Sequence, residues 1–153
     1  MTICVIPARG NSRRIPGKNL KVFHGKPIIQ YSIEAAQGAG FDVIVSTDDQ
    51  GIANFAESCK ADIHFRHWND PDGDVGTQEV VARTLERLDC GLFEYVMCLY
   101  ATTPGITSDL LAYAESTFIR SECTWLVGSY PHRMEDCGAL YIGQATSYFN
   151  RVG

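Results

Sequence analysis

Short apolar runs rich in β-branched residues alternate with stretches of helical periodicity, and this alternation constrains the fold more than any other feature of the chain. Residues 2–8 (TICVIPA) and 42–46 (DVIVS) have the length and composition of strands buried on both faces. Between them, Ile29, Ile33 and Ala36 form an apolar stripe at helical spacing. Strands of this kind, joined by helices, make a mostly parallel sheet. We therefore expect a three-layer α/β/α fold of Rossmann-like type.

The same patterns predict the remaining elements. Strands are expected at residues 2–8, 42–46, 62–65, 95–99, 124–129 and 139–142. Helices are expected to start at Pro27, after a cap at Thr47-Asp48-Asp49, at Thr77, and after Thr107 or Ser108. Residues 9–25 hold three Gly, one Pro and two Asn, which predicts a long loop. Ligands of parallel α/β sheets bind beyond the carboxyl ends of the strands, so this loop follows the first strand at the expected binding edge.

Length and composition limit the remaining possibilities. The 153 residues suit one domain, and no repeat or linker divides them, so residues 1–153 are expected to form a single domain. No apolar run reaches 18 residues, which predicts no membrane span. The six cysteines form no CxxC pair and lie mostly in apolar runs. This usage indicates reduced thiols and a cytoplasmic location.

The charges are unevenly distributed along the chain. Residues 1–33 carry six basic and no acidic side chains, whereas the remaining 120 residues carry 7 basic and 18 acidic ones, a net charge of −11. The pI of about 5.3 argues against a general nucleic-acid-binding surface. One basic segment in an acidic protein instead indicates a local anionic ligand.

Residues 7–19 (PARGNSRRIPGKN), which we call the basic loop, hold most of that positive charge. They contain neither the GxGxxG dinucleotide fingerprint nor the GxxxxGK[ST] of a Walker A loop. Their chemistry still points to phosphate. Gly10 and Gly17 allow backbone N–H groups to turn toward an anion. Arg9, Arg13 and Lys18 can supply charge-assisted hydrogen bonds.

With these residues in view, the chain resembles a known family, the nonulosonic (sialic and pseudaminic) acid cytidylyltransferases, or CMP-sugar synthetases. The resemblance is carried first by PARGNSRRIPGKNLKVFHGKPIIQYSIEAA at residues 7–36. Later segments agree in the same order: VSTDD at 45–49, FR at 65–66, CLYATTP at 98–104 and CGALYI at 137–142. Since these segments span nearly the whole chain, the resemblance implies the family's nucleotide-diphospho-sugar transferase type of fold, with a nucleotidyltransferase site.

The resemblance also implies a reaction, in which CTP and an acidic nine-carbon sugar give a CMP-sugar and pyrophosphate. By matching position, Arg9, Arg13 and Lys18 would act as catalytic residues that bind the triphosphate and stabilise the departing pyrophosphate. The nucleotide as a whole would contact Ala8, Arg9, Gly10, Asn11, Ser12, Arg13, Lys18, Asn19, Arg66 and Thr77. The sugar would contact Tyr100, Ala101, Thr102 and Thr103.

The chain departs from the family pattern at two places. The segment after residue 130 is much shorter than the excursion with which the family builds a dimer, which predicts a monomer, or else a dimer built in another way. The family's late aspartate motif, which binds Mg²⁺, is absent from residues 1–153. The resemblance implies Mg²⁺ as cofactor, and magnesium sites need carboxylate oxygens beside the substrate phosphates. Asp136 is the candidate substitute ligand.

Two alternatives from other functional classes stay open. The first is a non-catalytic nucleotide-binding domain that kept the basic loop and lost its metal site. The second is a metal-dependent glycosyltransferase, because Asp72-Gly73-Asp74 matches the short DxD pattern of those enzymes. Magnesium-dependent release of pyrophosphate distinguishes a cytidylyltransferase from the first alternative, and sugar transfer from a preformed nucleotide-sugar would single out the second.

Overall fold

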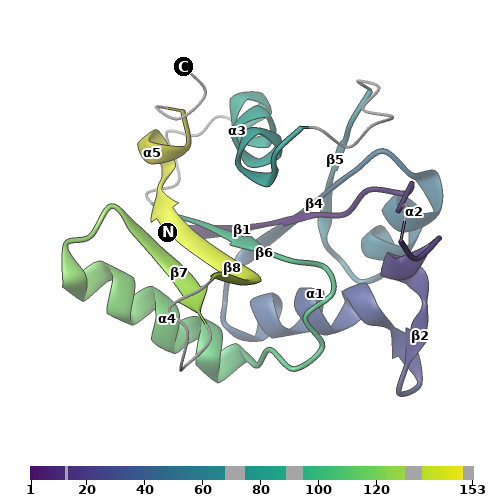
Figure 1. Ribbon diagram of the computed structural model, residues 1–153, viewed down its shortest axis with the longest axis horizontal. Helices are drawn as coiled ribbons and strands as arrows, with labels where there is room; N and C mark the ends of the chain where they lie inside the picture. The colour runs from purple at the N-terminus through teal and green to yellow at the C-terminus, as the bar shows by residue number, and fades with distance from the viewer. Residues whose placement is uncertain (13, 68–74, 89–94, 130–135, 150–153) are drawn as a thin grey trace.

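A six-stranded sheet forms the centre of the molecule (Figure 1). The computed structural model describes residues 1–12, 14–67, 75–88, 95–129 and 136–149. The strand order is β5-β4-β1-β6-β8-β7, in which the first four strands run parallel and β8 lies antiparallel to both β6 and β7. The strands are β1 Thr2–Pro7, β4 Asp42–Thr47, β5 Asp62–Phe65, β6 Tyr95–Leu99, β7 Trp125–Ser129 and β8 Asp136–Gln144. The expected mostly parallel sheet is therefore confirmed.

Helices cover both faces of this sheet (Figure 1). They are α1 Ile28–Gly38, α2 Gln50–Ser58, α3 Thr77–Arg87, α4 Ser108–Ser121 and α5 Ala145–Phe149. Alternate residues of β1 point to opposite faces: Cys4 and Ile6 pack with α1, α2 and α4, while Ile3 and Val5 pack with α3 and α5. This alternation produces the predicted three layers. Among the described residues, none of the helices combines the length and apolar character needed to cross a membrane.

The segment predicted as a continuous loop, residues 9–25, contains regular structure, and that prediction was wrong in part. A 3₁₀ helix occupies Lys18–Leu20, and a small hairpin pairs β2 (Val22–Phe23) with β3 (Lys26–Pro27). The hairpin turn is His24-Gly25, with φ of +44° and +92°. Positive φ at both central residues matches the twist of the flanking strands, so two residues suffice for the turn.

A buried polar cluster joins β4, β5 and α3 behind the carboxyl edge of the sheet. His64 Nδ1 lies 2.8 Å from Thr84 Oγ1 and 3.2 Å from Ser46 Oγ, and all three residues are buried. Burial lowers the pKa of His64, and the nearby Arg87, Arg66 and His67 lower it further. The imidazole is therefore held in its neutral form.

The low pKa of His64 predicts a pH-dependent stability. In the unfolded chain His64 binds a proton near pH 6.5, whereas the folded protein resists that protonation. Protonation of His64 should therefore have little effect on the free energy of unfolding above about pH 6.5, and this free energy should fall as the pH drops below that value. Urea unfolding at pH 7 and pH 5.5 measures the loss. His64→Gln keeps a hydrogen-bond acceptor but does not titrate, so an equal loss in that variant would contradict the assignment.

Candidate active site

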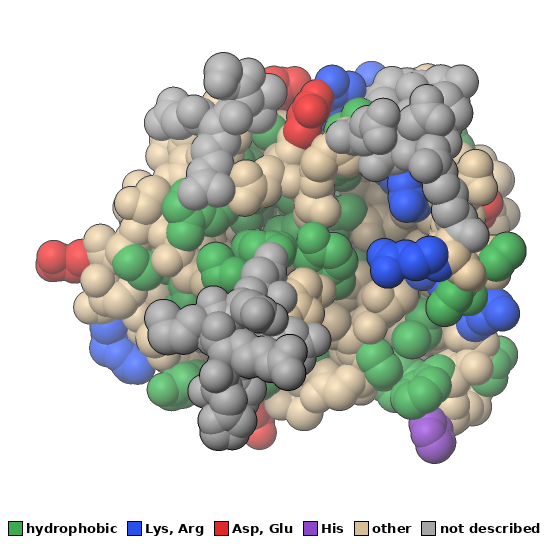
Figure 2. All heavy atoms as spheres, viewed as in Figure 1, with side chains coloured by type: hydrophobic (Ala, Val, Ile, Leu, Met, Phe, Trp, Pro, Cys, Tyr) green, Lys and Arg blue, Asp and Glu red, His purple; other side chains and the backbone are tan. Residues whose placement is uncertain are grey.

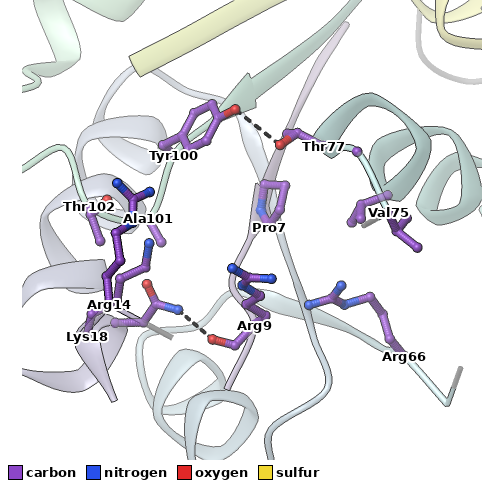
Figure 3. Close-up of a pocket in the computed structure, with 13 residues that line it drawn as sticks. Pro7, Arg9, Arg14, Lys18, Arg66, Val75, Thr77, Tyr100, Ala101 and Thr102 are labelled. Carbon is purple, nitrogen blue, oxygen red and sulfur yellow. Dashed lines mark hydrogen bonds between the residues drawn. The ribbon is translucent and has the colours of Figure 1, made fainter. Parts of the chain in front are cut away.

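A cavity of about 330 Å³ opens at the carboxyl-terminal edge of the parallel strands (Figure 3). Its walls come from the ends of β1, β5 and β6, from the basic loop after β1, and from the start of α3. We call it the main cavity; it is lined by Pro7, Arg9, Arg14, Lys18, Asn19, Arg66, Val75, Gly76, Thr77, Val80, Tyr100, Ala101 and Thr102. Its position agrees with the edge at which such sheets bind ligands.

The main cavity is strongly cationic. Arg9, Arg14, Lys18 and Arg66 line it, and none of its described lining residues is acidic. Figure 3 shows the Arg66 guanidinium pointing toward that of Arg9 across the cavity. In the view of Figure 2, several Lys and Arg side chains lie on the right of the molecule. Burial lowers the pKa of Lys18, and Arg9 and Arg14 lower it further. These mutually repelling charges favour a polyanionic ligand.

The basic loop is held in place by contacts to its own backbone and to the two aspartates that follow β4. Asn19 is buried, and its Nδ2 donates to the Arg9 carbonyl over 3.0 Å. The Gly10 N–H donates to Asp48 Oδ1 over 2.8 Å. The chain passes so close to Asp49 that a Cβ built on Gly10 would lie 2.6 Å from the Asp49 Cβ. Only glycine fits at this position without a shift of its neighbours.

The two aspartates after β4 have different partners, although sequence reasoning treated both as part of one helix cap. Asp49 caps α2, because its Oδ1 accepts from the Ile52 N–H over 2.9 Å. Asp48 instead accepts from Gly10 and lies 3.6 Å from Arg66 Nη2. The carboxylate of Asp49 thus caps α2, whereas that of Asp48 contacts Gly10 of the basic loop and Arg66 of the main cavity.

The opposite wall of the cavity joins α3 to the turn after β6. The Thr77 hydroxyl lies 3.1 Å from the Tyr100 hydroxyl. Behind this pair, the Tyr100 carbonyl accepts from Ser32 Oγ at 2.9 Å and from Thr103 Oγ1 at 2.8 Å. Ser32 is fully buried on α1, so the turn is anchored from beneath. These bonds fix the side of the cavity assigned to the sugar by the resemblance.

The structure brings many of the sequence-predicted residues together. Those that line the main cavity are Arg9, Lys18, Asn19, Arg66, Thr77, Tyr100, Ala101 and Thr102. Ala8 is buried at the end of β1, Asn11 is exposed, and Gly10 and Thr103 support the walls through the hydrogen bonds above. Arg13, Asp72 and Asp74 lie outside the described residues.

Sequence reasoning missed some lining residues and a neighbouring cavity. Arg14 was counted in the basic segment but given no role, although it lines the main cavity. Ser12 lines a second cavity, of about 440 Å³, which we call the side cavity. Its walls also include Lys21 and Phe23, and it shares Arg14, Lys18 and Thr102 with the main cavity.

The described residues do not form a metal site of their own. They contain no group of three or more His, Cys, Asp or Glu side chains placed to hold an ion. Asp136, the sequence candidate, begins β8, whose amino end lies at the same sheet edge as Leu99 and Tyr100 because the strands are antiparallel. Its side chain is outside the described part of the chain.

A sheet of this order, with a cationic cavity at the carboxyl ends of its parallel strands, places the chain among α/β proteins that offer an anion-binding edge. Comparison with known proteins narrows the class. A family model described as cytidylyltransferase matches residues 3–134. The chain therefore belongs to the cytidylyltransferase family, which confirms the family-level resemblance seen in the sequence.

A curated relative agrees with this family assignment. The chain is 36% identical, over 147 residues, to the pseudaminic acid cytidylyltransferase of Campylobacter jejuni serotype O:2. The match covers 93% of this chain and 63% of the relative, so the chain spans less than two thirds of that protein's length.

Solved structures agree with the fold. A CMP-2-keto-3-deoxy-manno-octonic acid synthetase complexed with CTP superposes with a TM-score of 0.75 at 19% identity, over 99% of this chain and 77% of that one. The Rv0371c protein of Mycobacterium tuberculosis, solved in complex with manganese, gives a TM-score of 0.72 at 16% identity, over 97% and 73%. These matches confirm the predicted nucleotidyltransferase type of α/β fold.

Proposed function

We propose that this protein joins CTP and an acidic nine-carbon sugar to give a CMP-sugar and pyrophosphate. The observation that carries the proposal is the main cavity, where four cations and no described carboxylate meet at the carboxyl edge of a cytidylyltransferase fold. The relative named a pseudaminic acid cytidylyltransferase supports an acidic sugar as the acceptor.

The proposed reaction is a displacement at the α-phosphorus of CTP. The oxygen of a sugar hydroxyl forms the new P–O bond and releases its proton to water, and the bond from the α-phosphorus to the oxygen that bridges to the β-phosphate breaks, so that pyrophosphate leaves with the electron pair. Arg9 and Lys18, with Arg13, neutralise the charge that accumulates on the leaving group. Arg66, Thr77 and the backbone of residues 8–10 hold the cytidine, and residues 100–103 orient the sugar.

Mg²⁺ is the proposed cofactor, because proteins that act on triphosphates usually bind this ion between the phosphate oxygens of the substrate and one or two carboxylates of the protein. The manganese complex of the structural neighbour from M. tuberculosis supports a divalent ion in this fold. Asp136, at the start of β8, is the candidate ligand that the chain itself would supply.

The remaining proposals concern the state of the protein. We propose that residues 1–153 form a single domain and act as a monomer, since the excursion that builds the family's dimer is shortened. A cytoplasmic location is supported by the described cysteines, all of which are free thiols. CTP and the sugar are the proposed partners; the acidic pI supports the absence of a nucleic-acid partner.

Calorimetric titration with CTP, UTP, ATP and GTP, each with and without Mg²⁺, tests the proposal. Binding should be strongest for CTP and should tighten with Mg²⁺, and CTP with the acidic sugar should release pyrophosphate. Absence of binding to every nucleotide would refute the proposal. Magnesium-independent CTP binding without pyrophosphate release would favour the non-catalytic alternative.

A further inference from the structure

Asp48 stands at the carboxyl end of β4, between two parts of the site that are far apart in sequence. Its Oδ1 accepts a hydrogen bond from the Gly10 N–H at 2.8 Å and lies 3.6 Å from Arg66 Nη2. Gly10 lies in the basic loop, and Arg66 follows β5 and lines the main cavity. The carboxylate of Asp48 therefore contacts both the basic loop, at Gly10, and the Arg66 guanidinium of the main cavity.

The environment of Arg66 makes this carboxylate important. The Arg66 side chain is only 5% exposed, whereas that of Asp48 is 29% exposed. The Arg66 N–H also donates to the Thr47 carbonyl at 2.7 Å, so backbone and side chain are both anchored at the end of β4. A guanidinium that has lost most of its water is sensitive to the position of a nearby charge.

Asp48 is not among the residues that line the main cavity, so it acts through the groups that it contacts. We propose that Asp48 is a positioning residue of the nucleotide site, which holds the Arg66 guanidinium and, through the Gly10 N–H, the backbone of the basic loop at the cytidine end of CTP. This inference rests on the proposed CTP-binding function and names a residue that the function requires.

The proposal makes a prediction opposite to that of simple electrostatics. Coulomb's law alone says that removing a negative charge beside a cationic cavity strengthens the binding of any polyanion. If Asp48 has a positioning role, the same change weakens the binding of CTP and leaves unchanged the binding of a ligand that has no nucleoside. Inorganic tripolyphosphate is such a ligand, so the ratio of the two affinities separates the explanations.

The variant Asp48→Asn is the test, because an amide oxygen still accepts from Gly10 while the ion pair with Arg66 is lost. Calorimetry should show CTP bound about tenfold more weakly, with tripolyphosphate bound as tightly as by the wild type or more tightly. Asp49→Asn is the matched control: it removes the same charge one residue away, retains the cap oxygen of α2, and should leave CTP affinity unchanged.

A double-mutant cycle shows whether Asp48 acts through Arg66. In an Arg66→Met background, Asp48→Asn should cause no further loss of CTP affinity. Thermal unfolding of each variant confirms that the proteins compared are folded. CTP binding by Asp48→Asn as tight as by the wild type, or a parallel weakening of tripolyphosphate, would overturn the inference while the proposed function stands. Failure of the wild type to bind CTP would overturn both.

Discussion

Lys18→Met is expected to lower the rate of CMP-sugar formation by about 10²–10³-fold, the usual effect of removing one group that stabilises developing charge. Lys18 lines the main cavity beside Arg9 and Arg14. Its partial burial reduces the solvent screening of the ammonium group, which strengthens its attraction for a leaving pyrophosphate. Pyrophosphate release measured at saturating CTP and sugar gives the effect on kcat.

Lys21→Met is the matched control for this change. Lys21 is an exposed lysine of the same basic segment and lines the side cavity but not the main one. Loss of a general electrostatic attraction would affect both variants alike and would appear mainly in KM. An equal loss of kcat in the two variants would therefore contradict a specific role for Lys18.

The lowered pKa of Lys18 adds a pH signature to the same experiment. In the proposed complex CTP binds the charged ammonium, so affinity should be full below the lowered pKa and should decrease as the pH rises through it. The decrease should start below the pKa of 10.5 of an ordinary lysine, because burial, Arg9 and Arg14 all favour the neutral form. Lys18→Arg should abolish this alkaline decrease, since arginine remains protonated.

The sheet was predictable because its strands are short apolar runs with clear ends. The strands predicted at 62–65 and 95–99 are confirmed residue for residue. By contrast, the hairpin β2–β3 has two residues in each strand, which is too short to show a periodic pattern. Helix α5, Ala145–Phe149, was missed for the same reason.

The cationic part of the site was predictable because its residues are adjacent in sequence. Arg9, Lys18 and Asn19 lie within eleven residues of the basic loop, so their shared chemistry is visible without a structure. Asp48 and Gly10 are 38 residues apart, and no local pattern connects them. Asp48 also stands next to a true helix cap, which provided a sufficient local explanation for both aspartates.

Gly10→Ala is expected to destabilise the protein by about 1–3 kcal/mol, the usual cost of forcing a methyl group into a filled space. The new Cβ would lie 2.6 Å from the Asp49 Cβ and 2.7 Å from its Oδ2. Asp49 cannot withdraw freely, because its other carboxylate oxygen caps α2. The loop must therefore move, and the Gly10 N–H moves away from Asp48 with it. CTP affinity should decrease together with the free energy of unfolding.

Two further variants test that explanation of the Gly10→Ala effect. Gly105→Ala is the matched control, because its Cβ would meet no atom within 4 Å. In the double variant Gly10→Ala with Asp49→Gly, the clash is removed, and glycine at a helix N-cap costs only a few tenths of a kcal/mol. Stability and CTP affinity should then recover toward the wild type. If urea unfolding and calorimetry show additive losses instead, contact with Asp49 is not what requires glycine at position 10.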